Sequence, residues 1–483
     1  FGFKIFLRWQ VWDTKSFHNE NPREDRSRIL SAVAIPYNSS SHHQETVARK
    51  RKILIVMKSS AVIAVLFAIT CYRAYHLFFP NESCDSDPTI RLNITLPEGS
   101  DALLFSWESC QVYSLEYHEA RSKFRAAARK LGAQAASIPV ILDDGTDDSP
   151  LTMDIAILKG DLPGVLVHSS GIHGVEGYAG SAIQVALLQE GVLPPPEQRP
   201  TIVFLHAVNP SGMKNYRRFN EKNIDLNRNA IANFEEFLSR RDPNVARYDD
   251  FRFLTAPRRS PTWGDRTIGF LWKVLPALQK HGYVTLKRAL VAGQYHHPEG
   301  IFYGGTQLEP SLQQLVQFMM EEERNILAPL GKKEPVVWID VHTGLGPFGM
   351  DTLQTEKDVS IENMDKWFPT AYDRLIPTNR ASGALDGYEL STGTLMSLVH
   401  ELSQNTTLCV TQEFGTLPGI LVARAFILEN MVHHYGSDQD QKTLGRAWLQ
   451  AAFYPQSARW RASVVRRGVA VALQSIQIIV NNS

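Results

Sequence analysis

Short apolar runs alternate with helix-like segments along most of this chain, and that alternation is the feature that most restricts its fold. The runs lie at residues 156–159, 165–168, 202–207, 336–341 and 408–412, and helix-like segments occupy residues 179–190, 311–327 and 443–453. Strands that alternate with helices favour a parallel or mixed sheet whose two faces are both covered. We therefore predict an α/β fold with a mixed, mostly parallel central sheet flanked by helices on both faces.

The predicted folded body spans residues 97–480. Residues 230–335 carry polar and proline-rich pieces that interrupt the alternation, and we interpret them as a substantial insertion folded onto the same domain. The sequence shows no repeat with a period of about 20–50 residues and no low-complexity tract.

Residues 1–52 are polar, rich in Lys and Arg, and lack a sustained apolar period. We predict that this leader is disordered or is not part of the mature protein. The next segment, residues 53–79, contains the most apolar run of the chain, and Met57 followed by Lys58 begins the pattern of a signal peptide. An uncleaved signal anchor is the other interpretation of this segment.

Basic residues lie on the N-terminal side of the apolar run, so the positive-inside rule places the body on the lumenal or outer face. We therefore predict a secretory-pathway protein, either secreted or membrane-anchored through residues 53–79 with a lumenal or extracellular body. The glycosylation sequons at Asn81, Asn93 and Asn405 agree with this compartment. Cys84 and Cys110 could form a disulfide there, although their spacing does not determine the connectivity.

The charge balance and the missing motifs exclude several function classes. Among the 483 residues, 50 Lys+Arg are matched by 50 Asp+Glu, which argues against nucleic acid as a partner. A G-x-S-x-G motif and a G-x-x-x-x-G-K-[ST] motif are both absent from the sequence, which disfavours a serine hydrolase and a phosphate-binding loop.

The most informative stretch is residues 164–180, where a strand-like run ends in glycines and is followed by His173 and Glu176. On a turn that enters a helix, positions three apart face the same way, so this imidazole and carboxylate can converge on one ion. A solvent-facing pair at a helix start is the alternative.

A second strand-like run delivers His342 at its end, directly before glycines. Ligand sites of open α/β sheets form where strands end in loops, so His342 is a third candidate ligand. Asp340, two residues earlier on the same strand, could orient a neighbouring group. A structural role for His342 is the alternative.

Glu413 lies in a late strand-like run among apolar neighbours, a setting that tends to raise a carboxyl pKa. A glutamate beside a metal-activated water can accept the proton of that water and pass it to a leaving amine. Pairing with an arginine at a sheet edge is the alternative for this residue.

A basic stretch follows the N-P-S-G run at residues 209–212 and includes Arg217, Arg218, Asn227 and Arg228. One guanidinium of this stretch can stabilise an oxyanion, and an Asn/Arg pair can grip a carboxylate. An ordinary basic loop is the alternative.

Taken in order, H-x-x-E, N-P-x-G, R-x-N-x-x-x-x-D-L-N-R-N, a strand-ending His and a late strand-borne Glu resemble the zinc carboxypeptidase superfamily. That superfamily includes carboxypeptidase A-like peptidases and aspartoacylase-like deacylases. The H-G-V-E-G, D-L-N-R-N, F-Y-G-G and H-T-G-L-G runs look most like a branch of domains of unknown function. The resemblance covers roughly residues 110–475.

The resemblance implies that one zinc ion is held by His173, Glu176 and His342, with Glu413 as general base and acid. It also implies that Arg218 polarises the substrate carbonyl, with Arg217 as the competing assignment. Asn227 and Arg228 would then clamp a substrate carboxylate, and Tyr388 is a candidate for the tyrosine that family peptidases carry on a loop.

Two features depart from the pattern of the superfamily. Ser211 replaces the more usual acidic residue of N-P-D-G, and the stretch between Asn229 and His342 is longer than in simple carboxypeptidases. That insertion contains an aromatic and glycine-rich stretch at residues 294–305. We expect this stretch to wall the substrate pocket, with His296 and His297 as substrate-side or structural residues.

The sequence thus predicts a zinc-dependent hydrolase that cleaves an amide next to a free carboxylate, in a peptide or an N-acyl amino acid. The alternative is a non-catalytic, membrane-tethered binding protein of the same fold, for which we would expect a degraded site.

Overall fold

The structure is a computed structural model that describes residues 84, 87–94, 103–141, 150–267, 269–321, 334–355, 359, 361–369, 376–377, 391–403 and 407–482. The chain divides into two units, Phe1–Leu66 and Phe67–Ser483, and all described residues lie in the second. The predicted leader, the predicted signal segment, Tyr388, Asn81 and Asn405 lie outside the described residues.

An eight-stranded sheet forms the centre of the fold, with strand order β3-β4-β6-β5-β7-β10-β8-β9. The four central strands β6, β5, β7 and β10 are parallel, whereas β3, β4 and β8 run antiparallel to a neighbour. The strands are β3 (Gln134–Ile141), β4 (Leu151–Leu158), β5 (Leu162–Ser170), β6 (Pro200–His206), β7 (Val336–Gly344), β8 (Asp351–Thr355), β9 (Ile376–Pro377) and β10 (Leu408–Gly415).

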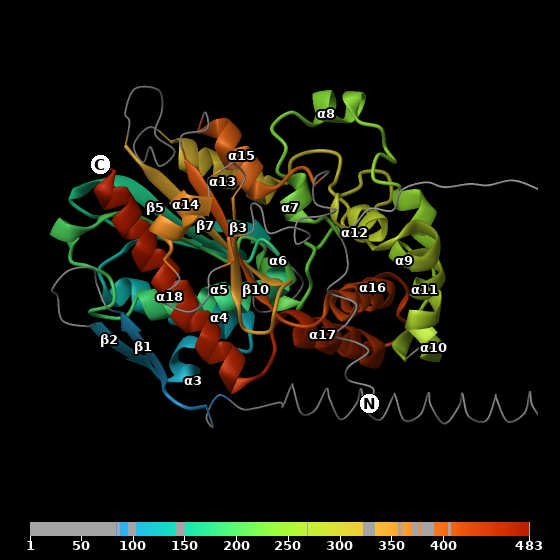
Figure 1. Ribbon diagram of the computed structural model, residues 1–483, viewed down its shortest axis with the longest axis horizontal. Coiled ribbons are helices and arrows are strands. Elements are labelled where there is room, and N and C mark those ends of the chain that lie inside the picture. The colour runs from blue at the N-terminus through green and yellow to red at the C-terminus, as the bar shows by residue number, and fades with distance from the viewer. Residues whose placement is uncertain are drawn as a thin grey trace, which may run out of the picture. The chain divides into compact units, whose positions relative to one another are not determined.

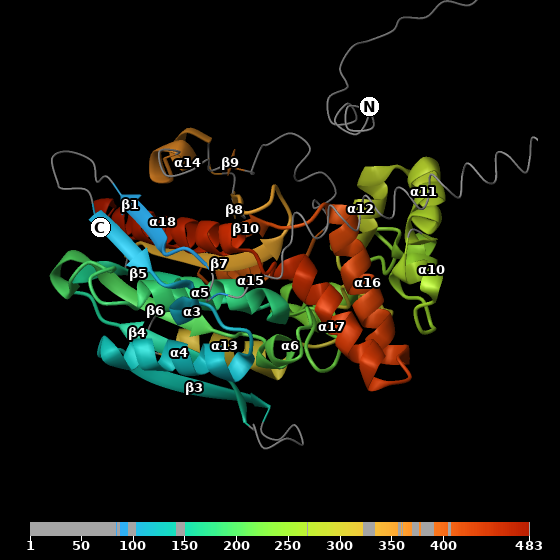
Figure 2. The same cartoon turned by 90° about the horizontal axis from the view of Figure 1, so that it is seen from below.

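Alternate side chains of the central strands enter two separate cores, which is why these strands carry runs of consecutive apolar residues. Leu166 packs on one face with α4 (Tyr117–Lys130), α5 (Gly177–Leu187) and α18 (Ala458–Asn481), which all contribute to the same hydrophobic cluster. Val167 packs on the other face with α13 (Pro310–Met320) and α15 (Leu395–Leu402). Helices therefore cover both faces, and the predicted fold class is confirmed (Figures 1 and 2).

The segment predicted to be an insertion is largely helical. Its apolar side chains form a third core with α16 (Gly419–Tyr435) and α17 (Gln439–Phe453). In both views its helices α10 to α12 lie on the same side of the molecule as α16 (Figures 1 and 2). The helices of the segment before α13 are α8 (Phe234–Arg240), α9 (Arg252–Thr255), α10 (Trp263–Arg266), α11 (Gly269–His281) and α12 (Tyr283–Val291).

A two-stranded antiparallel sheet of β1 (Ile90–Ile94) and β2 (Leu103–Trp107) precedes α3 (Ser109–Val112), and its apolar residues join the core beneath α18. A disulfide joins Cys84 to Cys110, with the two Cα atoms 5.1 Å apart. The remaining helices are α6 (Pro210–Lys214), α7 (Leu226–Asn229) and α14 (Ile361–Trp367).

Within the described residues, α18 is the one helix long and apolar enough to cross a membrane by length and composition. The fold buries 72% of its most apolar window, and Trp460 and Val464 are fully enclosed. The apolar composition of α18 is therefore accounted for by its position against α5 and the central strands.

Candidate metal centre and active site

Three parallel strands deliver the predicted site residues to one edge of the sheet. His173 follows β5, His342 lies near the end of β7, and Glu413 lies near the end of β10. Because β5, β7 and β10 are neighbours that run in the same direction, their carboxyl ends meet. Glu413 is paired in register with His342, so the two side chains are held on adjacent strands.

The turn after β5 is held close to the loop that carries the arginines. His173 precedes the 3-10 turn Gly174–Glu176, whose Gly174 and Val175 N–H groups donate to the carbonyls of Arg218 and Arg217. A Cβ atom on Gly174 would lie 2.0 Å from the backbone carbon of Gly212. Glycine at position 174 is therefore required for this close approach of two backbones.

His173, Glu176 and His342 form a buried group whose ligand atoms lie within 4.8 Å of one another. The Nδ1 atoms of the two histidines are 3.1 Å apart, and Glu176 oxygens lie 3.0 Å from Nδ1 of His173 and 3.2 Å from Nδ1 of His342. Tetrahedral zinc ligands bound at about 2.0–2.1 Å lie about 3.3 Å from each other. Two imidazole nitrogens and a carboxylate at this spacing can therefore hold one metal ion.

Buried carboxylates on the far side of each imidazole orient the two histidines. Nε2 of His173 lies 3.2 Å from Oδ1 of Asp225, and Nε2 of His342 lies 2.8 Å from Oδ2 of Asp340. When Nε2–H donates to a carboxylate, the lone pair of a neutral imidazole is on Nδ1, the atom that points into the site. The role foreseen for Asp340 matches this geometry.

The sequence analysis assigned no role to Asp225, although this residue begins the D-L-N-R-N run that contains Asn227 and Arg228.

A chain of buried hydrogen bonds supports Asp340 in turn. The Trp338 indole N–H donates to Oγ of Ser169 at 2.7 Å, and the Ser169 hydroxyl donates to Oδ1 of Asp340 at 2.7 Å. All four members of the chain from Trp338 to His342 are buried. Because each buried polar atom in the chain has a partner, the network restricts the imidazole of His342 to one orientation.

Arg218 bridges two of the buried carboxylates. Its Nη1 donates to Glu176 at 3.1 Å and its Nε donates to Asp225 at 3.1 Å. Burial would raise the pKa of Glu176, but His173, His342 and Arg218 together hold that pKa well below its usual range. Burial would likewise raise the pKa of Asp225, and Arg218 and His173 reverse that effect. Both carboxylates are therefore charged at neutral pH.

Arg217 points elsewhere. Its Nε donates to Glu429 at 2.7 Å, and its Nη2 donates to Oδ1 of Asn223 at 2.8 Å. These contacts tie the arginine loop to α16, which carries Glu429. A cavity opens beside the metal-binding group, and His173, His342 and Arg218 contribute to its lining. Arg217 lies outside that lining, in the network behind Arg218.

Glu413 lines the same cavity and is only 9% exposed. Its Oε1 accepts the N–H of Leu345 at 2.8 Å. Burial raises the pKa of Glu413 to about 7, and the nearby charge of Glu176 contributes to the rise. A carboxylate whose pKa lies near neutrality can both accept and return a proton. No arginine at a sheet edge is among the hydrogen-bond partners found for this side chain in the described residues.

Asn227 and Arg228 also line the cavity, as the predicted carboxylate clamp requires. The guanidinium of Arg228 donates to the backbone carbonyls of Val291 and Asn227, and Oδ1 of Asn227 accepts the N–H of Leu395. These contacts hold both side chains at the cavity wall. The clamp itself stays a prediction.

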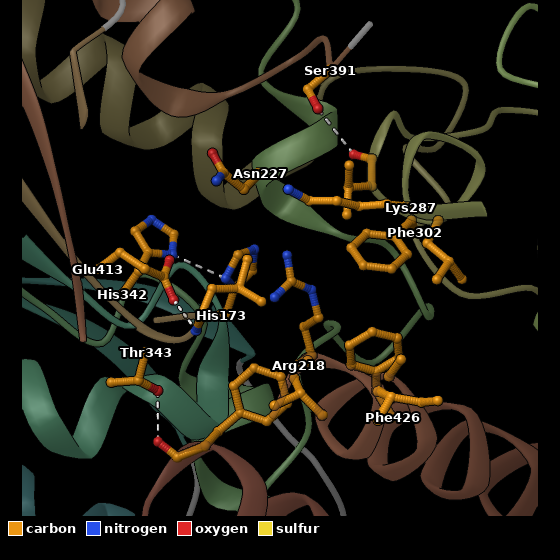
Figure 3. Close-up of a pocket in the computed structure, with 18 of the residues that line it drawn as sticks. His173, Arg218, Asn227, Lys287, Phe302, His342, Thr343, Ser391, Glu413 and Phe426 are labelled. Atoms are coloured by element: carbon orange, nitrogen blue, oxygen red, sulfur yellow. Dashed lines mark hydrogen bonds between the residues drawn. The ribbon is translucent and has the colours of Figure 1, made fainter. Parts of the chain in front are cut away.

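The cavity has a volume of about 480 Å³, and its two sides differ in character. Figure 3 shows His342, His173 and Glu413 on one side, with Arg218 between them and the rings of Phe302 and Phe426. Lys287 of α12 extends toward Asn227 in the same view (Figure 3). Sequence reasoning did not single out Lys287, because a lone lysine on a helix carries no signal of its own.

His296 and His297 lie outside this cavity lining and share the carboxylate of Asp249. The stretch predicted to wall the pocket contributes Phe302, whose ring lies under the guanidinium of Arg218 at 4.9 Å. Pairing with Asp249 agrees with the structural role considered for the two histidines.

Comparisons with known proteins extend these observations. The family described as "Protein of unknown function (DUF2817)" matches residues 113–467, a stretch that holds the whole candidate site. The chain belongs to this family. A search of curated proteins found no match.

Solved structures similar to this DUF2817 protein include a fibrinolysis inhibitor, a carboxypeptidase A and a protein assigned as succinylglutamate desuccinylase/aspartoacylase. Bovine thrombin-activatable fibrinolysis inhibitor, in complex with tick carboxypeptidase inhibitor, is 13% identical, with 77% of this chain and 100% of that chain covered and a TM-score of 0.39. Carboxypeptidase A from Helicoverpa armigera is 14% identical, with coverage of 71% and 75% and a TM-score of 0.35.

A protein assigned as succinylglutamate desuccinylase/aspartoacylase from Shewanella frigidimarina is 18% identical, with coverage of 62% and 72% and a TM-score of 0.28. These overall likenesses are low.

Replacing Asp340 with asparagine tests the orientation of His342. Asp340→Asn keeps the size of the side chain but removes the charge that His342 faces, so we expect the affinity for Zn²⁺ to fall by about 10–100-fold. Competition with a chromophoric chelator measures this change. Asp365→Asn, at an exposed position of α14, is the matched control and should leave the affinity unchanged. An unaltered affinity in Asp340→Asn would contradict the assigned role.

Metal binding should release a proton from His342. Burial would lower the pKa of His342, but Asp340 and Glu176 raise it well above its ordinary value, so the metal-free imidazole is protonated at neutral pH. An ion can bind Nδ1 only after that proton leaves, so the affinity should rise by about tenfold per pH unit below this pKa. Calorimetry at pH 7 in two buffers of different ionisation enthalpy should show about one proton released by Glu413→Gln, a variant that removes the other group of the site that titrates near neutrality. Release of no proton would refute this protonation state.

Proposed function

We propose that this chain is a zinc-dependent hydrolase that cleaves an amide next to a free carboxylate, in a peptide or an N-acyl amino acid. The observation that carries the proposal is the arrangement of two Nδ1 atoms and the Glu176 carboxylate at 3.0–3.2 Å, with Glu413 paired in register with His342. Two histidines and one glutamate are a donor set typical of catalytic zinc, with a further position open to water or substrate.

A zinc ion bound by these residues would supply a Lewis acid that polarises the substrate carbonyl and makes water a stronger acid. Glu413 accepts a proton from the attacking water and then returns it to the nitrogen of the leaving amine. The Leu345 N–H holds one oxygen of Glu413 at 2.8 Å, which fixes the direction in which the carboxylate faces the cavity. The raised pKa of Glu413 suits a group that takes up and gives back a proton.

Arg218 places positive charge beside the substrate carbonyl. The charge that develops on that oxygen during attack would be stabilised by a guanidinium held in advance by Glu176 and Asp225. Asn227, Arg228 and Lys287 line the same cavity and are the groups available to recognise a substrate carboxylate. A carboxylate near this cluster would orient the neighbouring amide toward Glu413.

The disulfide between Cys84 and Cys110 supports a secretory-pathway location for this activity, because such bonds persist in oxidising compartments. We propose that the body works on the lumenal or extracellular side, tethered through residues 53–79 or released.

Glu413→Gln tests the proposed chemistry. The amide cannot accept a proton from water, so we expect hydrolysis of a responsive peptide or N-acyl amino acid to fall by about 10²–10⁴-fold, with zinc content unchanged. Mass-spectrometric screening of both substrate classes, followed by rate measurements, gives the comparison. Glu401→Gln, at an exposed position of α15, is the control. Full activity of Glu413→Gln would refute the mechanism, and tight zinc binding without turnover of either class by the native chain would favour a binding protein.

Lysine substitutions distinguish the two neighbouring arginines. Arg218→Lys keeps a positive charge but loses the fork that reaches Glu176 and Asp225, so kcat should fall at least about tenfold. Arg217→Lys should leave kcat within about threefold and instead lower the midpoint of thermal unfolding, because Arg217 holds Glu429 and Asn223. The opposite pattern in kcat would transfer the catalytic assignment to Arg217.

A further inference from the structure

Three helices build an apolar wall on the side of the cavity away from the metal-binding group. Each helix contributes side chains at intervals of three or four residues, which lie on one helical face. The wall consists of Phe270, Val274 and Leu278 of α11, Tyr283, Leu286, Leu290 and Val291 of α12, and Ile420, Val422, Ala423, Phe426 and Ile427 of α16. The zinc chemistry proposed above does not need this surface.

The length of the wall exceeds what one amino-acid side chain can cover. From Phe270 to Leu278 is eight residues, which at 1.5 Å per residue is about 12 Å along the helix axis. The contributions of α12 and α16 span eight residues, from Tyr283 to Val291, and seven residues, from Ile420 to Ile427. An extended peptide advances about 3.3–3.6 Å per residue, so the occupant is as long as about three residues or is an extended hydrocarbon chain.

The chemistry of the wall favours hydrocarbon over peptide. Among the described residues, α11, α12 and α16 contribute one charged side chain to the cavity lining, that of Lys287. Figure 3 shows this side chain directed toward Asn227. A peptide segment against the apolar residues would bury N–H and C=O groups without partners, which costs free energy. A chain of methylene groups has no such requirement and gains from every contact.

The polar residues lie at the other side of the same cavity. His173, His342, Glu413 and Arg218 are there, and Phe302 lies where the two sides meet, with its ring 4.9 Å from the Arg218 guanidinium and 5.7 Å from that of Arg228. A single ligand in this cavity would therefore be amphipathic, with an amide and a carboxylate beside the charged groups and an apolar chain along the three helices.

We propose that the substrate is an N-acyl amino acid with a long, unbranched acyl chain, and this inference rests on the proposed hydrolase function. Water adds its hydroxyl to the acyl carbonyl carbon, the carbon–nitrogen bond breaks, and the nitrogen gains a proton. The products are a fatty acid and a free amino acid. The apolar wall binds the acyl chain, and the cluster of Asn227, Arg228 and Lys287 faces the carboxylate of the amino acid.

Hydrolysis rates across acyl-chain lengths test the proposal with the full, zinc-loaded chain. N-acetyl-, N-octanoyl- and N-lauroyl-leucine, each below its micelle concentration, share one amino acid and differ only in hydrocarbon. Each buried methylene strengthens binding by about fourfold, so kcat/KM for the lauroyl compound should exceed that for the acetyl compound by at least about a hundredfold. Calorimetric binding of the same compounds to Glu413→Gln reports affinity separately from turnover.

A filling substitution tests where the chain lies. Val274 is 3% exposed and lines the cavity, so Val274→Trp should lower the ratio of kcat/KM for lauroyl- over acetyl-leucine by at least about tenfold. Leu275 is the next residue of α11 but is 50% exposed and absent from the lining, so Leu275→Trp should keep the native ratio. If Val274→Trp does not fold, the chain-length series of the native protein still decides whether the cavity recognises a long acyl chain.

The possible outcomes separate the substrate from the reaction. Equal rates for acetyl- and lauroyl-leucine would overturn the acyl-chain proposal and leave the hydrolase function in place. Faster cleavage of an apolar tripeptide than of lauroyl-leucine would overturn it in favour of a peptide. Chain-length-dependent binding to Glu413→Gln without hydrolysis by the native protein would overturn the hydrolase function, and with it the assignment of a substrate.

Discussion

The parallel alignment of β5, β7 and β10 is the constraint on which the site depends. Each strand is buried on both faces, so its register is set by two cores at once, and a shift by one residue would move every side chain to the wrong face. The same register sets Glu413 opposite His342 and brings His173 to the neighbouring strand end. The packing that stabilises the sheet therefore also sets the geometry of the site.

Buried charge is the second constraint, and it is balanced within a small volume. Glu176, Asp225 and Asp340 would each be costly to bury alone, but Arg218 and the two imidazoles face them from several sides. The outer carboxylates turn both Nδ1 atoms inward before any ion arrives. Little rearrangement is then needed when a metal ion binds, and that preorganisation is what a catalytic centre requires.

The helices α11, α12 and α16 have two roles that share the same residues. The aromatic and aliphatic side chains of α11, α12 and α16 form a third core, and several of them also line the cavity. A core built in this way leaves one apolar face available to a ligand. In the function that we propose, side chains at the ends of the sheet strands carry out the hydrolysis, and these helices bind the hydrocarbon part of the substrate.

The fold class follows from local pattern, because consecutive apolar runs that alternate with helix-like segments leave few alternatives to a covered, mostly parallel sheet. The order of its motifs, which resembles that of the zinc carboxypeptidase superfamily, also predicted His173, Glu176, His342 and Glu413 as site residues, and the tertiary structure brings these four residues together. Which arginine faces the cavity depends on the folded chain, because Arg217 and Arg218 are adjacent in the sequence and differ in the direction of their side chains. Asp225, Lys287 and the apolar wall likewise depend on contacts between segments far apart in the chain, and local pattern does not encode such contacts.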